Sequence, residues 1–165
     1  MLLKDKILQL KGPIFVFGAS GFIGANVLNE IIRVRKDCYG ISHNPRSAWR
    51  LKLMDMPNEN ILHCDINYKT SVETLFKKYN PQTVFNLSAY GAYSKQSDVG
   101  LIYETNILGT VNILENCKNI RAYIHAGSSS EYGLNSANPS EDSRLVPNSH
   151  YSVTKISTSY LIEYY

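Results

Sequence analysis

Short apolar runs alternate with longer amphipathic segments along the chain. The short runs are rich in β-branched and aromatic side chains, which predicts buried strands. These strands are expected at 14–19, 38–42, 60–64, 83–89 and 122–127. The segments between them repeat apolar residues at helical spacing, which predicts amphipathic helices. These helices are expected at 22–35, 46–54, 71–80, 101–119 and 151–165.

The alternation of strands and helices indicates the fold class. Strands that are apolar on both faces imply a parallel sheet covered by helices on two sides. Right-handed crossovers then give a doubly wound α/β sheet, a Rossmann fold, with the strand order 3-2-1-4-5. The 165 residues are enough for one such domain and too few for two. In the longest helix, Ile102, Leu108 and Ile113 are expected on the buried face.

The sequence GASGFIG lies where the first predicted strand turns into the first long helix, and it contains Gly18, Gly21 and Gly24. Gly18 permits a tight turn, Gly21 lets the backbone approach a pyrophosphate, and Gly24 lets the helix pack closely on the sheet. Backbone amides at the start of the helix would face the phosphate oxygens. They belong to Ser20, Gly21, Phe22 and Ile23. Three glycines also fit ordinary turns, but this strand–turn–helix context favours a dinucleotide site.

The end of the second predicted strand bears on the choice between NAD and NADP. NAD enzymes usually place a carboxylate there, which accepts a hydrogen bond from the ribose 2′-hydroxyl. Here the sequence YGISHNPRSAW has no carboxylate but contains His43, Asn44 and Arg46. A guanidinium near this position favours the 2′-phosphate of NADP, with a solvated surface charge at Arg46 as the alternative.

The ends of the third and fourth predicted strands supply further cofactor-binding candidates. Asp65 and Ile66 follow the third strand, within reach of an adenine amino group in such folds, although Asp65 could equally cap a helix or turn. Leu87, Ser88 and Ala89 end the fourth strand, and small residues there leave room for a ribose.

The last predicted strand runs into HAGSSSEYG, and the final helix begins with YSVTK. The serines therefore emerge at the same carboxyl edge of the sheet. Tyr151 and Lys155 are four residues apart on a helix, so their side chains face one way. A lysine cation and an oxidised nicotinamide would both stabilise the phenolate form of Tyr151. Tyr151 could then exchange a proton with a substrate hydroxyl, and a serine hydroxyl could hold the same oxygen.

Taken together, these motifs resemble an extended short-chain dehydrogenase/reductase of the NAD-dependent epimerase/dehydratase family. The resemblance runs from about residue 13 to the end and also includes CDI, NLSAYGAY and TNILGTVNILE. It implies that Tyr151 is the catalytic acid/base and that Lys155 is its partner and also binds the nicotinamide ribose. It places the catalytic serine at Ser128, four residues before Tyr132, and gives Asn106 a role in supporting the geometry of the active site.

The family acts on nucleotide sugars, and one position bears on the type of reaction. Sugar dehydratases of the family carry an acidic residue two positions before the tyrosine that corresponds to Tyr132, whereas this chain has Ser130 there and Glu131 one position later. In an extended segment that step turns the carboxylate to the opposite face, which favours an epimerase or 4-keto-reductase. A local bulge could restore the geometry. The YGISHNPRSAW stretch also resembles the NADP-using GDP-mannose dehydratase branch, so a 4,6-dehydratase stays open.

Composition and charge limit the other classes of protein. The net charge of +3 is spread along the chain and is not typical of a nucleic-acid-binding protein. No apolar run reaches membrane-spanning length, and no signal peptide is indicated, so we expect a cytoplasmic protein. The cysteines, Cys38, Cys64 and Cys117, lack metal-site spacing and are expected to be buried reduced thiols. No G-K-[ST] follows the glycines, which disfavours a P-loop NTPase.

Family members continue beyond the Tyr–Lys helix with further strands and a smaller domain that binds the nucleotide sugar. From this resemblance we expect the C-terminal substrate domain to be absent from the 165 residues. The chain could therefore bind a dinucleotide yet fail at turnover, which leaves a non-catalytic dinucleotide-binding module as an alternative. Related enzymes often pair through the helices expected at 101–119 and 151–165, so a homodimer is possible.

Overall fold

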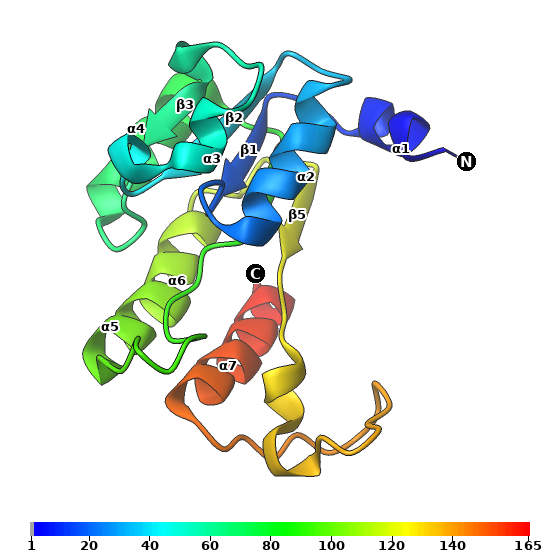
Figure 1. The fold of residues 1–165 in the computed structure, drawn as a ribbon, viewed down its shortest axis with the longest axis vertical. Helices are drawn as coiled ribbons and strands as arrows, with labels where there is room; N and C mark the ends of the chain where they lie inside the picture. Colours follow the sequence, from blue (N-terminus) through cyan, green and yellow to red (C-terminus); the bar gives the residue numbers. More distant parts are fainter. Residues whose placement is uncertain (1) are drawn as a thin grey trace.

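The computed structural model describes residues 2–165 and contains one parallel sheet of five strands (Figure 1). The strand order is β3-β2-β1-β4-β5, which confirms the predicted doubly wound topology. All four neighbouring pairs are parallel. The strands are β1 (Ile14–Phe17), β2 (Cys38–Ser42), β3 (Ile61–His63), β4 (Thr83–Asn86) and β5 (Ala122–His125).

Helices connect consecutive strands and cover both faces of the sheet (Figure 1). The α-helices are α1 (Leu3–Gln9), α2 (Phe22–Ile32), α3 (Trp49–Lys52), α4 (Lys69–Tyr79), α5 (Val99–Tyr103), α6 (Gly109–Leu114) and α7 (His150–Tyr164). A π-helical turn, Glu104–Leu108, joins α5 to α6. Short 3-10 helices lie at Pro45–Ser47, Asn58–Asn60 and Ser129–Asn135. Within residues 2–165, no helix is both long enough and apolar enough to cross a membrane.

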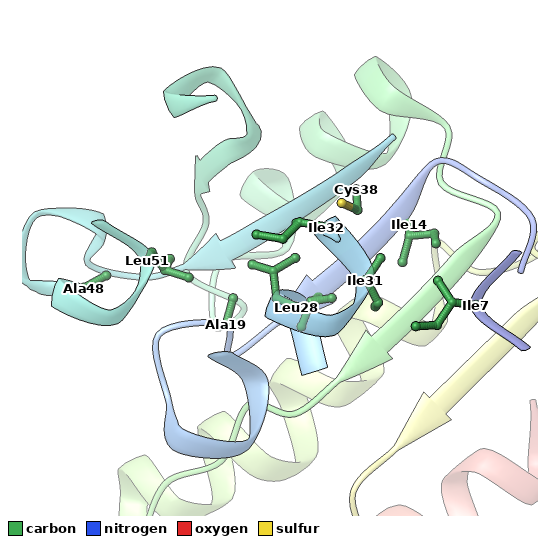
Figure 2. Packing of buried hydrophobic residues seen from close by; sticks show 10 residues of the cluster. Ile7, Ile14, Ala19, Leu28, Ile31, Ile32, Cys38, Ala48 and Leu51 are labelled. Atoms are coloured by element: carbon green, nitrogen blue, oxygen red, sulfur yellow. The ribbon is translucent and has the colours of Figure 1, made fainter. Parts of the chain in front are cut away.

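The central strand β1 shows why the sheet needs cover on both sides. Its side chains alternate between two hydrophobic clusters, and all four are fully buried. Ile14 and Val16 belong to the cluster that contains residues of α2, part of which is shown in Figure 2. Phe15 and Phe17 belong to the opposite cluster, where both rings contact the ring of Phe76 from α4. An apolar residue at every position of β1 is therefore required by the two-sided packing.

The N-terminal helix α1 was not expected from the sequence. Its residue Ile7 is buried and joins the same cluster as Ile14 and Ile31, and Figure 2 shows these three side chains together. Thr83 of β4 donates a hydrogen bond of 2.7 Å to the carbonyl of Lys11, just after the helix. Leu3 and Leu8 in the same helix are 59% and 54% exposed, so Ile7 is the buried residue of α1. That pattern is too short to predict a helix from periodicity alone.

The segment expected as one helix at 101–119 differs in the structure. Helical backbone runs from Val99 to Leu114 and is interrupted by the π-helical turn. One extra residue in that turn rotates the following side chains away from the predicted face. Leu108, expected to be buried, is 57% exposed, and Asn106 is buried instead. Ile102 and Ile113 are buried as predicted.

The fourth and fifth strands are shorter than the ranges 83–89 and 122–127 expected from the sequence. β4 ends at Asn86 and β5 at His125. The residues that follow are therefore loop residues at the carboxyl edge of the sheet, where open α/β sheets bind ligands. The short helix expected at 46–54 is likewise divided into the 3-10 helix Pro45–Ser47 and α3.

The packing of α1 can be tested by truncating its buried side chain. Ile7→Ala should lower the free energy of unfolding by roughly 2–5 kcal/mol, because it removes buried methyl groups and leaves a cavity. Leu8→Ala, in the exposed neighbouring position, should change it by no more than about 0.5 kcal/mol. Urea denaturation of both variants measures the difference. Equal stability of the two variants would show that α1 does not contribute to the core.

Candidate functional site

A cavity of about 380 Å³ lies at the carboxyl edge of the sheet. Its walls come from the ends of β1, β2, β3 and β4 and from the helical segment of α5 and the π-helical turn. The strand order reverses between β1 and β4, so the cavity lies at the topological switch point of the sheet. This is the position where doubly wound sheets bind their ligands.

The glycine turn after β1 forms one wall of the cavity. Gly18 has φ +71°, and a Cβ there would lie 2.6 Å from the backbone carbonyl of Leu87. A Cβ on Gly24 would lie 2.2 Å from the carbonyl oxygen of Gly18. These two positions therefore exclude any side chain, because the turn approaches β4 and helix α2 approaches the turn. Both observations agree with the packing roles expected of the two glycines.

Gly21 differs from the other two glycines. It is the N-cap of α2, has an ordinary φ of −72°, and lines the cavity. The only neighbouring atom near its Cβ position is the carbonyl oxygen of Gly18, at 3.2 Å. A side chain here would require a small shift of that carbonyl and would extend into the open space beside the first amides of α2. Those amides carry the partial positive charge of the helix end, which suits an anion.

Nine of the residues predicted to bind the cofactor line this cavity together. They are Gly18, Ser20, Gly21, His43, Asp65, Ile66, Leu87, Ser88 and Ala89. Phe22 and Ile23 do not line it, and their side chains are 69% and 59% exposed. Gly24 lies behind the turn and is buried. The structure thus brings together residues from four separate segments of the chain.

Sequence reasoning missed other residues of the cavity wall. They are Phe17, Ile41, Ser42, Cys64, Asn67, Tyr90, Leu101 and Thr105. Asn67 follows the predicted residues Asp65 and Ile66, and its backbone amide donates to the Asp65 carboxylate at 3.0 Å. Asp65 therefore stabilises a turn and also lines the cavity. The side-chain oxygen of Asn67 is buried and, within the described chain, has no hydrogen-bond partner.

Asn44 and Arg46 line a second, more open cavity of about 430 Å³. Its remaining wall comes from His43, Pro45 and His63, so it contains basic side chains and no carboxylate. Nearby, the Arg50 guanidinium donates to the carbonyl of Ser20 at 3.2 Å. His43 lines both cavities, which places the basic surface directly beside the main cavity.

The three residues expected to be catalytic lie at the same edge of the sheet but outside the wall of the main cavity. Ser128 is the N-cap of the 3-10 helix after β5, and its hydroxyl accepts from the amide of Ser130 at 3.1 Å. Tyr151 lies in the first turn of α7, and its hydroxyl has no hydrogen-bond partner within residues 2–165. Lys155, one turn later, is 3% exposed and donates to the carbonyl of Ala126.

A buried asparagine connects the cavity to the helix that carries Tyr151 and Lys155. The Asn106 side chain accepts from the amide of Tyr90 and donates to the carbonyl of the same residue, each at 2.9 Å. It also donates to the Thr154 hydroxyl at 2.9 Å. Tyr90 lines the cavity and Thr154 precedes Lys155, so this amide fixes the β4–α5 loop relative to α7.

Polar groups at the end of β5 surround the Lys155 ammonium. Its Nζ lies 3.1 Å from Nε2 of His125, and it also donates to the Ala126 carbonyl. Burial lowers the pKa of Lys155, and the Glu131 carboxylate acts in the opposite direction. Burial and the Lys155 charge together lower the pKa of His125 to about 4. The stability that neutral His125 provides is thus present above pH 6.5 and is lost as the pH falls toward about 4.

The serine-rich segment is not extended, so the geometric argument about Glu131 was wrong. Residues Ser129–Asn135 form 3-10 helical turns with a kink at Gly133. Glu131 folds back in a capping box, and its carboxylate accepts from the amide of Ser128 at 2.7 Å. The carboxylate therefore lies beside Ser128 instead of on the opposite face. The serine four residues before Tyr132 and a carboxylate thus share one turn.

The three cysteines remain free thiols in the structure. Cys38 and Cys64 are buried, and Cys117 is half-buried. Burial raises the pKa of Cys38 to about 11 and that of Cys117 to about 12, and it also raises the pKa of Cys64. These thiols stay protonated near neutral pH, which makes them poor nucleophiles.

Two curated relatives show the kind of protein that this chain resembles. A dTDP-glucose 4,6-dehydratase from Haemophilus influenzae is 29% identical over 172 residues, which cover 91% of this chain and 50% of the relative. UDP-glucuronate 4-epimerase 4 from Arabidopsis thaliana is 31% identical over 155 residues, which cover 86% of this chain and 35% of the relative. The chain therefore spans half or less of the length of these relatives.

Solved structures and a family model agree with this resemblance. The structure of UDP-glucuronic acid 4-epimerase from Bacillus cereus in complex with NAD matches with a TM-score of 0.77 and 27% identity, over 92% of this chain and 51% of that one. The model of the NAD dependent epimerase/dehydratase family matches residues 14–165. Since that match covers nearly the whole chain, the chain belongs to the NAD dependent epimerase/dehydratase family.

Proposed function

We propose that this chain is the cofactor-binding part of an NAD(P)-dependent nucleotide-sugar epimerase or 4-keto-reductase. The observation that carries the proposal is the position of Tyr151 and Lys155, which share one helix at the edge of the sheet that also holds the glycine-lined cavity. The Asn106 side chain links the cavity wall to this helix through hydrogen bonds to Tyr90 and Thr154. The relatives named above support the substrate class, since both are named for nucleotide sugars.

The residues that line the cavity support the binding of a dinucleotide. Gly21 leaves space beside the start of α2, and Ser88 and Ala89 are small. We infer that the pyrophosphate binds at the start of α2, the adenosine beside Asp65, and the nicotinamide ribose near Ser88 and Lys155. When bound, the nicotinamide would accept a hydride from a sugar carbon or donate one to it.

The residues of the chain would handle the protons of this reaction. Tyr151, in its phenolate form, would take the proton from the substrate hydroxyl as that carbon is oxidised, and would return it in the reverse step. The Lys155 ammonium would stabilise the phenolate and bind the ribose hydroxyls. Ser128 would donate a hydrogen bond to the same substrate oxygen. An epimerase would run both steps on one substrate, whereas a reductase would run only the second.

We further propose that NADP is bound in preference to NAD. The support is the second cavity, where His43, Arg46 and His63 surround the end of β2 without a carboxylate. A 2′-phosphate carries negative charge that these groups could pair, whereas a ribose 2′-hydroxyl would lack its usual carboxylate acceptor. The Bacillus cereus enzyme binds NAD, so this preference would distinguish the chain from that protein.

A nucleotide-sugar 4,6-dehydratase is the second candidate function. The observation that favours it is the capping box of Ser128 and Glu131, which puts a carboxylate beside the proposed catalytic serine. Such a carboxylate could act as the general acid that dehydration requires. The Haemophilus influenzae relative is named as a dehydratase of this kind. The resemblance of the YGISHNPRSAW stretch to the GDP-mannose dehydratase branch, which uses NADP, supports the same alternative.

A non-catalytic dinucleotide-binding module is a further alternative, which binding without turnover would support.

The proposed partners are a nucleotide sugar and, in a homodimer, a second copy of the chain. Leu108, Tyr160 and Tyr164 support the homodimer, since they expose apolar surface on the helical segment of α5 and α6 and on α7. A cytoplasmic location remains an expectation.

Gly21→Val tests the pyrophosphate position. The variant should weaken dinucleotide binding by at least about tenfold, because its side chain would occupy the space beside the first amides of α2. Phe22→Ala is the matched control, since it keeps its backbone amide and removes an exposed ring. Calorimetric titration with both dinucleotides gives the affinities. An unaltered affinity of Gly21→Val would contradict the assignment.

Arg46→Ala tests the cofactor preference. We expect the affinity for NADP to fall roughly tenfold while the affinity for NAD stays within about twofold, because only NADP carries the 2′-phosphate. Arg33→Ala removes the same charge from a remote exposed site and should change neither affinity. Parallel titrations of the two dinucleotides measure the ratio. Equal losses for NAD and NADP would refute the preference.

Tyr151→Phe tests the catalytic role. Turnover of nucleotide sugars should fall by roughly 100-fold or more, because the acid/base hydroxyl is lost, while dinucleotide affinity stays nearly unchanged. The assay follows the products by mass and stereochemistry, with this chain and with any longer form of the reading frame. A stereoisomer supports an epimerase, and loss of water supports a dehydratase. A variant with full turnover would refute the role of Tyr151.

A further inference from the structure

A half-buried histidine, His125, is the last residue of β5 and lies beneath the Lys155 ammonium. Its ring is on the same side of the sheet as Tyr123, two residues earlier in the strand. In the neighbouring strand its register partner is Asn86, which is fully buried. Neither Tyr123 nor His125 has a part in the proposed proton transfer, although both lie close to it.

The direction of the hydrogen bonds follows from the chemistry of lysine. An ammonium group can only donate, so Nε2 of His125 must accept from Lys155, and the imidazole proton is on Nδ1. Nδ1 lies 3.5 Å from the hydroxyl of Tyr123. That hydroxyl also accepts from the Asn86 amide at 3.1 Å, and the same amide donates to Thr110 at 3.3 Å. A continuous polar path thus runs from α7 through β5 and β4 to α6.

This arrangement requires that His125 stays neutral. The charged or titratable groups around it are Lys155 from α7, Tyr123 on its own strand and, acting on Lys155, Glu131 from the turn after β5. The ammonium and the burial of the ring both oppose protonation. The acceptor nitrogen is therefore available to Lys155 at neutral pH.

A buried ammonium depends strongly on its acceptors. Water does not replace them, because Lys155 is 3% exposed. In the described part of the chain, the Lys155 ammonium has two hydrogen-bond acceptors, the Ala126 carbonyl and His125. The carbonyl belongs to the backbone and is present whatever the side chains are. His125 is thus the side chain that directly fixes the position of the charge.

We propose that His125 is a positioning residue, whose neutral ring holds the Lys155 ammonium at the carboxyl end of β5 through Nε2. The functional consequence rests on the proposed role of Lys155 in binding the ribose of the cofactor. If the Lys155 ammonium were displaced, it would bind the ribose less well and would stabilise the Tyr151 phenolate less well. The hydrogen bond itself can be tested without turnover.

Two substitutions of similar polarity distinguish the contribution of Nε2 from that of Nδ1. In His125→Gln the side-chain amide reaches the position of Nε2, whereas in His125→Asn it reaches only the position of Nδ1. Titration of the Lys155 signal by NMR, assigned with Lys155→Met, reports on the ammonium directly. We expect His125→Asn to lower the pKa of Lys155 by about one pH unit and His125→Gln to leave it near the wild-type value. Dinucleotide affinity should fall about tenfold in the first variant and less than about twofold in the second.

The outcomes distinguish this inference from the proposed function. A Lys155 titration that is unchanged in His125→Asn, or lowered equally in both variants, overturns the positioning role. If His125→Asn lowers the pKa of Lys155 and His125→Gln does not, the positioning role is supported, whether or not the wild-type chain binds a dinucleotide. Failure of the wild-type chain to bind a dinucleotide would count against the proposed function alone.

A measurement on the unaltered chain covers the case in which a variant does not fold. As the pH falls through about 4, His125 becomes protonated and its Nε2 changes from acceptor to donor. The Lys155 nitrogen signal should then change in the same step. A His125 titration without a matching step at Lys155 would overturn the inference.

Discussion

The buried amide of Asn106 is the contact on which the geometry of the site depends. Its hydrogen bonds to both backbone groups of Tyr90 and to the Thr154 hydroxyl join a loop of the cavity to the helix of Tyr151 and Lys155. These hydrogen bonds fix the position of the loop relative to the helix. A buried amide satisfied in this way has one arrangement, because an unpaired polar group in the interior is costly.

The sheet combines this polar edge with an apolar centre. In β1 all four side chains are buried between two helical layers, which fixes the strand and leaves its carboxyl end to the glycine turn. In β5, by contrast, the Tyr123 hydroxyl lies within 3.5 Å of the His125 ring, and His125 contacts Lys155 of α7. The centre of the sheet is therefore apolar, and the proposed site residues lie in the loops and at the strand ends of one edge. Parallel sheets of this type place ligands there.

The sequence predicted the sheet order and the glycine turn because both follow from local patterns. Buried strands such as β1 read as apolar runs, and Gly18 and Gly24 stand where a side chain cannot fit. The sequence did not predict α1, which depends on the tertiary contacts of Ile7. The π-helical turn around Asn106 was missed because it interrupts the helical periodicity of the segment. The capping box of Glu131 was missed although Ser128 and Glu131 have the S-x-x-E spacing of such a box. The roles of Ser128, Tyr151 and Lys155 remain predictions, because the contacts that would define them involve a bound cofactor and substrate.

We propose that one crevice joins the glycine turn to Tyr151 and Lys155 and that a nicotinamide dinucleotide occupies it. A crystal structure of the chain with bound dinucleotide would test this arrangement. We expect the pyrophosphate against the first amides of α2 and the nicotinamide ribose within hydrogen-bond distance of Lys155. A nicotinamide ring bound elsewhere, remote from Tyr151, would contradict it.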